Sequence, residues 1–254
     1  MSATERDDAL TALACLDLTS LNDNDDARAI GALCARALTP WGRVAAVCVW
    51  PRFVAQARAA LPGEVAVAAV ANFPAGELDE RLALADTQAI VDAGGDEIDL
   101  VLPWRAMLDG RAADAAQLVR RVRSACAGKR LKLIIESGEL PSAEAIAQAS
   151  GIGLDAGVDF LKTSTGKAAH GASLDAARVM VRAIAAQPRA VGFKAAGGIR
   201  TVADATGYAA LVREHLGDGA VGPQRLRFGA SGLLGDIERL LSGSGAAAPP
   251  PSAY

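Results

Sequence analysis

Short apolar runs alternate along this chain with stretches whose apolar residues recur every three or four positions. The runs favour β-strands, and they occupy residues 15–20, 44–50, 65–73, 96–103, 131–137, 158–164, 190–196 and 225–231. Most are continuously apolar, which is typical of parallel strands covered on both faces. The stretches between them, such as residues 77–95 and 140–157, have helical periodicity and end near glycine. A strand followed by a helix, eight times over, predicts a single (β/α)8 TIM barrel of the α/β class.

The length of the chain agrees with one domain. It has 254 residues, and a TIM barrel commonly takes about 250. We predict a barrel catalytic domain over residues 1–241, with an extra N-terminal helix near residues 5–13 that lies across the barrel floor. Residues 242–254 contain only Ser, Gly, Ala, Pro and a final Tyr, without a periodic apolar face. This composition predicts a flexible C-terminal tail.

Composition and charge exclude several classes of function. Lys and Arg number 26 against 29 Asp and Glu, and aromatic residues are only 4% of the chain, so we expect no nucleic-acid partner. The chain does not begin with a basic segment and an apolar run, and no stretch approaches the roughly 18 apolar residues of a membrane span. The protein is therefore expected to be soluble and cytoplasmic.

A metal site is not expected either. The cysteines, Cys15, Cys34, Cys48 and Cys126, are scattered and never form a CxxC motif. With only two histidines in the chain, a histidine-rich site cannot be assembled.

Polar residues follow the predicted strands where a barrel has its active site. The active site of a TIM barrel lies at the carboxyl ends of its strands, and the polar residues expected there are Asp17, Cys48, Asn72, Asp99, Glu136, Lys162 and Lys194. Burying an isolated charge is costly, so these groups must be paired, hydrated or functional. A purely structural network of ion pairs is the alternative interpretation.

Two of these residues indicate a particular chemistry. Lys162 ends the strand of VDFLKTSTGK (158–167), and Lys194 lies in AVGFKAAGGIR (190–200). A buried lysine beside a second cation has its charged form disfavoured, which leaves some free amine. Such an amine can attack a carbonyl and form a Schiff base.

Glycine clusters after the last three strands indicate a phosphate site. Gly166 and Lys167 follow the sixth strand, Gly197 and Gly198 follow the seventh, and GASG (229–232) follows the eighth. Glycine allows backbone N–H groups to approach an anion, and a helix N-terminus favours negative charge at this position of a barrel. Ordinary turn glycines are the alternative at any one of these places.

These motifs together resemble the deoxyribose-phosphate aldolase family, whose members are class I aldolases with a barrel fold. The similar segments cover almost the whole chain in order: LDLTSLND (16–23), CVWPRF (48–53), NFPAG (72–76), DEIDLVLP (96–103), KLIIESGEL (132–140), DFLKTSTGK (159–167), GFKAAGGIR (192–200) and RFGASGLL (227–234). The resemblance implies reversible cleavage of 2-deoxy-D-ribose 5-phosphate to acetaldehyde and D-glyceraldehyde 3-phosphate without a cofactor. It also implies a homodimer.

The resemblance assigns roles to individual residues. Lys162 is the Schiff-base lysine, Lys194 lowers its pKa and takes part in proton transfer, and Asp99 is the acid/base carboxylate. Asp17 and Asn22 are implied to position Lys194 and the substrate hydroxyls. The residues that match phosphate or substrate contacts are Thr165, Gly166, Lys167, Gly197, Gly198, Arg200, Ser231 and Gly232. Gly232 stands where the family commonly has a second serine, and the terminal Tyr254 resembles a tyrosine that assists proton transfer.

Two other functions remain open at the level of sequence. A different Schiff-base barrel enzyme, such as a transaldolase-like or ketose-phosphate aldolase, would use the same lysine on another sugar. A non-catalytic barrel that binds phosphosugars would use the lysines only to neutralise phosphate.

Overall fold

The computed structural model of the protein describes residues 2–243. Within them, parallel strands close into a barrel in the spatial order β1, β10, β9, β8, β7, β6, β5, β4. The strands are β1 (Leu16–Thr19), β4 (Ala46–Val49), β5 (Ala66–Ala71), β6 (Glu97–Val101), β7 (Arg130–Ile134), β8 (Phe160–Lys162), β9 (Gly192–Ala196) and β10 (Leu226–Ala230). Each lies within one of the predicted runs or begins one residue before it, so the predicted TIM barrel is confirmed.

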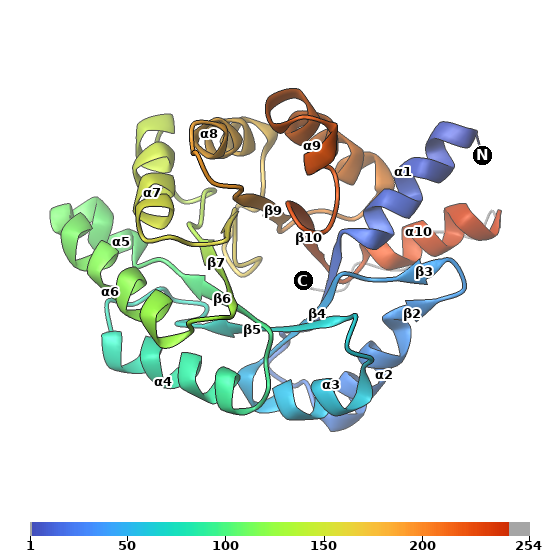
Figure 1. The fold of residues 1–254 in the computed structure, drawn as a ribbon, viewed down its shortest axis with the longest axis horizontal. Coiled ribbons are helices and arrows are strands. Elements are labelled where there is room, and N and C mark those ends of the chain that lie inside the picture. The colour runs from blue at the N-terminus through green and yellow to red at the C-terminus, as the bar shows by residue number, and fades with distance from the viewer. Residues whose placement is uncertain (1, 244–254) are drawn as a thin grey trace.

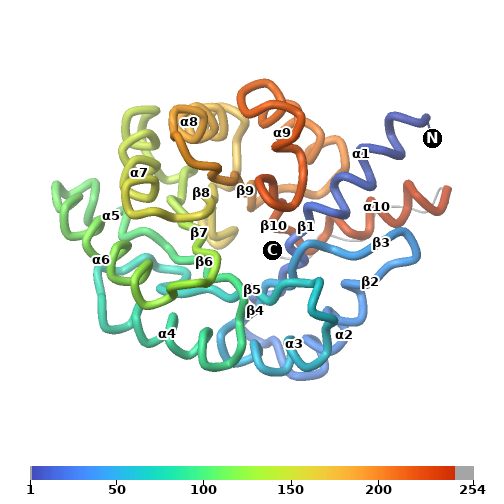
Figure 2. Tube along the Cα trace, viewed as in Figure 1, coloured from blue at the N-terminus to red at the C-terminus, as the bar shows by residue number. Residues whose placement is uncertain are grey.

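Helices surround the barrel and cover the outer faces of its strands (Figure 1). They are α1 (Ala3–Ala14), α2 (Ala27–Arg36), α3 (Val54–Ala60), α4 (Glu80–Asp92), α5 (Trp104–Ala106), α6 (Ala112–Ala125), α7 (Ala143–Asp155), α8 (Leu174–Ala185), α9 (Val202–Leu216) and α10 (Leu233–Ser242). Short 3-10 helices span Pro51–Phe53 and Asp218–Ala220, and a π-helix spans Met107–Arg111. The chain trace in Figure 2 follows the alternation of strand and helix round the ring.

Side-chain caps fix where several of these helices begin. The backbone N–H of Ala145 donates to the Ser142 hydroxyl at the start of α7, at 3.3 Å. At the start of α9, Thr201 and Asp204 form a capping box in which each side chain accepts from the other residue's backbone N–H. Because these caps satisfy N–H groups that helix geometry leaves unpaired, they set the ends of the loops that carry the site.

The two faces of the barrel strands differ in polarity. In β6, Ile98 and Leu100 belong to the large apolar core, whereas the alternate residues Glu97 and Asp99 are buried but charged. Successive side chains of a strand point to opposite faces, so this alternation places the charges inside the barrel. The same pattern buries further charged residues on the other strands, namely Asp17, Lys132, Lys162, Lys194 and Arg227. We predicted strands that are apolar on both faces, but in the structure only the outer face of these strands is apolar.

The expected N-terminal helix is present, but its position differs from the prediction. A capping box between Ser2 and Glu5 begins α1, and the helix packs against α9, α10 and β3 (Figure 1). The cavity at the amino ends of β5 to β8 has no α1 residue in its lining. The helix thus covers the side of the barrel near β1 and leaves that part of the floor open. The helix takes this position because its buried residues, Ala9, Ala12 and Leu13, pack against neighbouring helices.

Three other features complete the fold. A small antiparallel pair, β2 (Leu38–Thr39) and β3 (Gly42–Arg43), was not predicted. Ser242, the first residue of the expected tail, is the last residue of α10, and Gly243 ends that helix with φ 68°. The other residues of the expected tail, including Tyr254, lie outside the described part of the chain.

None of the helices described is long and apolar enough to cross a membrane.

Candidate active site

The structure brings four of the predicted site residues together inside the barrel. Lys162 and Lys194 lie opposite each other in the register of β8 and β9. The Nζ atom of Lys162 donates to Oδ2 of Asp99 at 2.9 Å, and Nζ of Lys194 donates to the same oxygen at 2.8 Å. Lys194 also donates to Oδ2 of Asp17 at 2.5 Å. All four residues are buried, with Lys162 only 1% exposed, so one carboxylate oxygen links the two lysines.

The cluster is larger than predicted. Nζ of Lys132 lies 2.7 Å from Oδ1 of Asp99 and 2.6 Å from Oε2 of Glu97. Arg227 donates to Asp17 at 2.5 Å and to Glu97 at 2.9 Å. Glu97, Lys132 and Arg227 therefore form a second tier of charge below the predicted residues, nearer the amino ends of the strands.

A signal for these missed residues was present in the sequence. Glu97 and Asp99 are two residues apart in EIDLV, and Lys132 stands between Leu131 and Leu133. A charged residue that alternates with aliphatic ones in a strand points to the face opposite the apolar core. The prediction took one polar residue from each of the first seven strands, and it therefore left out Glu97, Lys132 and Arg227.

The three buried carboxylates are held ionised by their partners. Burial acts to raise the pKa of Asp99, but Lys132, Lys162 and Lys194 together hold it well below its usual value. The pKa of Asp17 is lowered by Lys194 and Arg227 against the effect of burial. Lys132 and Arg227 likewise lower the pKa of Glu97 to about 2, although burial raises it. Each carboxylate therefore carries a negative charge near neutral pH.

Counting the fully buried charges singles out one amine. Among the buried side chains that these ion pairs join, three carboxylates (Asp17, Glu97 and Asp99) face four basic groups (Lys132, Lys162, Lys194 and Arg227). Burial tends to lower the pKa of Lys132 and Lys194, but neighbouring carboxylates raise both above the ordinary lysine value. Arg227 also has a raised pKa despite its burial. Three cations then balance three anions, and a charge on Lys162 would be in excess.

Lys162 is the one member of this group of lysines whose pKa is lowered. Burial is the main cause, Asp99 opposes it, and the ammonium of Lys194 lowers the pKa further. The sequence analysis named both burial and a neighbouring cation, and burial is the larger of the two causes. Although Lys162 has a carboxylate partner and almost no exposure, that carboxylate is shared with Lys132 and Lys194. The negative charge of Asp99 is therefore already balanced by Lys132 and Lys194, without a charge on Lys162.

A cavity with both polar and apolar lining residues lies near the mouth of the barrel. Its volume is about 250 Å³, and its lining includes Trp104, Glu136, Thr165 and Lys167. Oε1 of Glu136 accepts a hydrogen bond from the backbone N–H of Thr165 at 3.0 Å. Burial raises the pKa of Glu136. Thr165 and Lys167, both predicted to contact substrate, thus lie at the surface of a space that a small molecule can enter.

The glycine loops after β8 and β9 lie against each other. Gly166, Gly197 and Gly198 all have positive φ, of 78°, 84° and 91°. A Cβ on Gly171 would lie only 2.4 Å from the carbonyl oxygen of Gly197, and the N–H of Ala172 donates to that oxygen at 3.0 Å. These conformations favour glycine and bring two of the predicted phosphate-binding segments together.

The third predicted segment follows β10. Gly229 pairs with Ala196 in the register of β10 and β9, so Ser231 and Gly198 each lie two residues beyond that pair. Gly232 is the N-cap of α10 and supplies no side-chain cap. The N–H of Arg200 donates to Asp204 at 3.0 Å, and Arg200 is exposed. The segments that contain the predicted phosphate residues therefore follow adjacent strands at the same end of the barrel.

Among the described residues, Asn22 lies outside the hydrogen-bonded cluster of lysines and carboxylates. The Asn22 side chain donates to Ser20 at 3.2 Å and to Asp25 at 3.1 Å, so it stabilises its own loop and does not pair with Asp17 to position Lys194. Its expected contact with the substrate hydroxyls stays a prediction. Tyr254 lies outside the described residues.

Comparisons with known proteins give the family. The sequence profile of the DeoC/LacD family aldolases matches residues 11–233. The chain is 46% identical to the deoxyribose-phosphate aldolase of Agrobacterium fabrum, over 94% of this chain and 93% of that protein.

Solved structures agree. A Coccidioides immitis protein assigned as a deoxyribose-phosphate aldolase has a TM-score of 0.78 at 30% identity, covering 89% of this chain and 85% of that chain. The tetrameric deoxyribose-phosphate aldolase of Aeropyrum pernix shares the fold, with a TM-score of 0.71 at 22% identity over 95% of this chain and 99% of that chain. The chain is thus a member of the DeoC/LacD aldolase family.

Proposed function

We propose that this protein is a deoxyribose-phosphate aldolase that cleaves 2-deoxy-D-ribose 5-phosphate reversibly to acetaldehyde and D-glyceraldehyde 3-phosphate. The observation that carries the proposal is the single buried amine, Lys162, left over when the charges of the barrel interior are paired. The 46% identity to the Agrobacterium fabrum enzyme supports the choice of substrate.

The reaction begins at Lys162. Its free amine adds to the aldehyde carbon of the open-chain sugar, and loss of water gives a protonated imine. A base then removes the proton from the C3 hydroxyl, and the bond between C2 and C3 breaks. Its electron pair moves into the imine to form an enamine, and glyceraldehyde 3-phosphate leaves. Protonation of the enamine carbon and hydrolysis by water return acetaldehyde and the free amine.

Asp99 and Lys194 are suited to the proton transfers. The Asp99 carboxylate lies 2.9 Å from the reacting nitrogen and can accept a proton through a water molecule, while the Lys194 ammonium can donate one. Asp17 holds Lys194 in place at 2.5 Å. The positive charge of Lys194 also favours the neutral form of Lys162 before each cycle.

The glycine loops supply a site for the phosphate. Backbone N–H groups of Gly166, Gly197, Gly198 and Gly232, with the side chains of Thr165, Lys167, Arg200 and Ser231, would hold the dianion at the mouth. Binding the remote phosphate positions the sugar carbonyl over Lys162, which converts binding free energy into orientation.

Reductive trapping tests this function. Acetaldehyde and borohydride are expected to add an ethyl group to Lys162, which peptide mapping by mass spectrometry would locate. Turnover of 2-deoxyribose 5-phosphate over ketose phosphates would separate this enzyme from other Schiff-base aldolases. Phosphosugar binding without trapping or turnover would instead indicate a non-catalytic barrel.

The proposal extends to the organisation of the protein. We infer a catalytic domain over residues 1–241, a C-terminal tail in residues 242–254, a cytoplasmic location and a homodimer. The four cysteines are unpaired and buried, which agrees with a reducing compartment. Light scattering would measure the oligomeric state. For Tyr254, removing the residue and following deuterium exchange at the acetaldehyde methyl group would test a role in proton transfer.

A further inference from the structure

A chain of charged contacts connects the reacting lysine with the opposite end of the barrel. From Lys162, the contacts run to Asp99 at 2.9 Å, from Asp99 to Lys132 at 2.7 Å, and from Lys132 to Glu97 at 2.6 Å. The last contact joins Glu97 to the guanidinium of Arg130 at 2.6 Å. Every member except Arg130 is at least 99% buried, so little solvent screens the charges along this chain.

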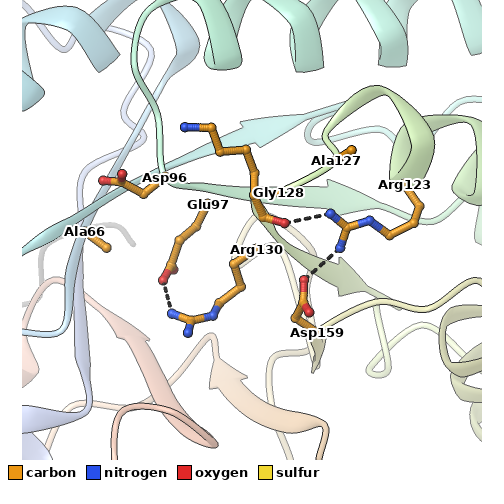
Figure 3. Close-up of a pocket in the computed structure, with 9 residues that line it drawn as sticks. Ala66, Asp96, Glu97, Arg123, Ala127, Gly128, Arg130 and Asp159 are labelled. Atoms are coloured by element: carbon orange, nitrogen blue, oxygen red, sulfur yellow. Dashed lines mark hydrogen bonds and ion pairs between the residues drawn. The ribbon is translucent and has the colours of Figure 1, made fainter. Parts of the chain in front are cut away.

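Arg130 is the member that reaches solvent. It begins β7 at the amino end of the barrel, and its side chain is 30% exposed. It lines a floor cavity of about 700 Å³ formed at the amino ends of β5 to β8. Figure 3 shows its guanidinium beneath the Glu97 carboxylate. A second N–H of the guanidinium donates to Gln224 at 2.8 Å, so two partners hold the side chain in place.

We propose that Arg130 is a positioning residue for the aldol reaction, acting on Lys162 through Glu97, Lys132 and Asp99. Its guanidinium binds one oxygen of Glu97, which leaves the other oxygen to hold Lys132 against Asp99. It also adds positive charge to the interior from below, and this charge favours the free amine at Lys162. The inference rests on the proposed function.

The other groups that face Lys162 do not replace this contribution. Asp99 from β6 contacts the amine and also Lys194 from β9, whose charge acts on Lys162. Cys48 on β4 and Glu136 beyond the end of β7 interact with Lys162 electrostatically. Cys48 is neutral because burial raises its pKa, and the Glu136 carboxylate accepts from Thr165. Among residues 2–243, Asp99 is the residue whose contacts link Lys162 to the lower tier, so the effect of Arg130 passes through that carboxylate.

The sign of the effect follows from charge. Replacing Arg130 with methionine removes one positive charge and leaves Glu97 with Lys132 and Arg227 as partners. The interior becomes more negative, which stabilises the ammonium form of Lys162 and raises its pKa. A unit charge about 10 Å away shifts a pKa by about one unit at an effective dielectric constant of about 20.

Arg123→Met is a matched control. Arg123 lines the same floor cavity, and Figure 3 shows it paired with Asp159, at 2.8 Å. Its other N–H groups donate to the backbone carbonyls of Cys126 and Lys129. The substitution therefore removes an arginine from the same surface without touching the chain of contacts that leads to Lys162.

The experiment measures the pH dependence of reductive trapping on Lys162 with acetaldehyde, and of kcat/KM for 2-deoxyribose 5-phosphate. The acid limb of both profiles is expected to move to higher pH by about half a unit or more in Arg130→Met. It should stay in place in Arg123→Met and return toward the wild-type position in Arg130→Lys. Because Arg130 is partly exposed, Arg130→Met should fold, which its thermal unfolding would verify.

The outcomes separate this inference from the proposed function. If the wild-type protein forms no imine on Lys162, both are wrong. If the wild type is trapped and turns over but Arg130→Met has the wild-type profile, only the role of Arg130 is wrong. Equal shifts in Arg130→Met and Arg123→Met would also overturn it, because the effect would then be one of general surface charge. A loss of stability with unchanged pH profiles would indicate a structural role alone.

Discussion

β8 and β9 carry a lysine at paired positions of the barrel, yet the surroundings of the two lysines shift their pKa values in opposite directions. Lys162 has one carboxylate contact, to Asp99. Lys194 has two, to Asp17 and Asp99. Both side chains are buried, but the pKa of Lys162 is lowered and that of Lys194 is raised well above its ordinary value.

Burial alone therefore does not produce a reactive lysine. Desolvation disfavours both ammonium groups, but at Lys194 the combined effect of Asp17 and Asp99 exceeds that cost. At Lys162, the attraction to the shared Asp99 carboxylate does not compensate for the cost of desolvating the ammonium group. The number of carboxylates available to each lysine decides which one is the nucleophile and which one stays a cation.

The largest effect is expected from Lys162→Ala. Without the amine no imine forms, so turnover should fall by about four orders of magnitude or more while the fold is retained. Steady-state kinetics and circular dichroism measure the two properties. Appreciable aldol cleavage by a folded Lys162→Ala protein would show that another residue is the nucleophile, and Lys194 would then be the first to test.

A large but smaller effect is expected from Lys194→Met. The Oδ2 atom of Asp99 would then contact Lys162 but no longer Lys194, so the Asp99 charge would stabilise the ammonium form of Lys162 more strongly. The pKa of Lys162 would rise, and a smaller fraction of it would be free amine at neutral pH. Because the amine reacts above that pKa, the acid limb of kcat/KM should move to higher pH. With the loss of the proton donor, the rate near pH 7 should fall by about 10² to 10⁴. An unchanged pH profile would mean that Lys194 does not control the charge of Lys162.

The smallest effect is expected at the mouth, from Lys167→Ala. This change removes a cation from the predicted phosphate site without touching the interior, so KM should rise by about tenfold or more while kcat and the pH profile stay close to wild type. Lys129→Ala, at the opposite end of the barrel, is the matched control. A fall in kcat with no change in KM would place Lys167 in the chemistry, in conflict with the separation between mouth and interior.

The sequence was sufficient for the upper part of the site. Asp17, Asp99, Lys162 and Lys194 are each the last charged residue of a predicted strand, and barrel geometry gathers the carboxyl ends of the strands at one end of the barrel. The lower tier was less accessible because Glu97, Lys132 and Arg227 belong to the middle or beginning of their strands. The local hydrogen bonds of Asn22 to Ser20 and Asp25 were not predicted either, because a motif does not reveal which partners a loop offers.

The amino-acid sequence by itself determined the barrel, because the period of its apolar residues specifies strand and helix in turn and parallel strands so connected must close or stack. It also determined which residue types reach the carboxyl ends of the strands. Only the tertiary structure decided which lysine is left without a balancing charge. That outcome depends on distances between β1, β6, β7, β8, β9 and β10, and on the count of charges enclosed among them. Electrostatic interaction depends on separation in space and on exclusion of water, and neither is encoded in the spacing along one strand.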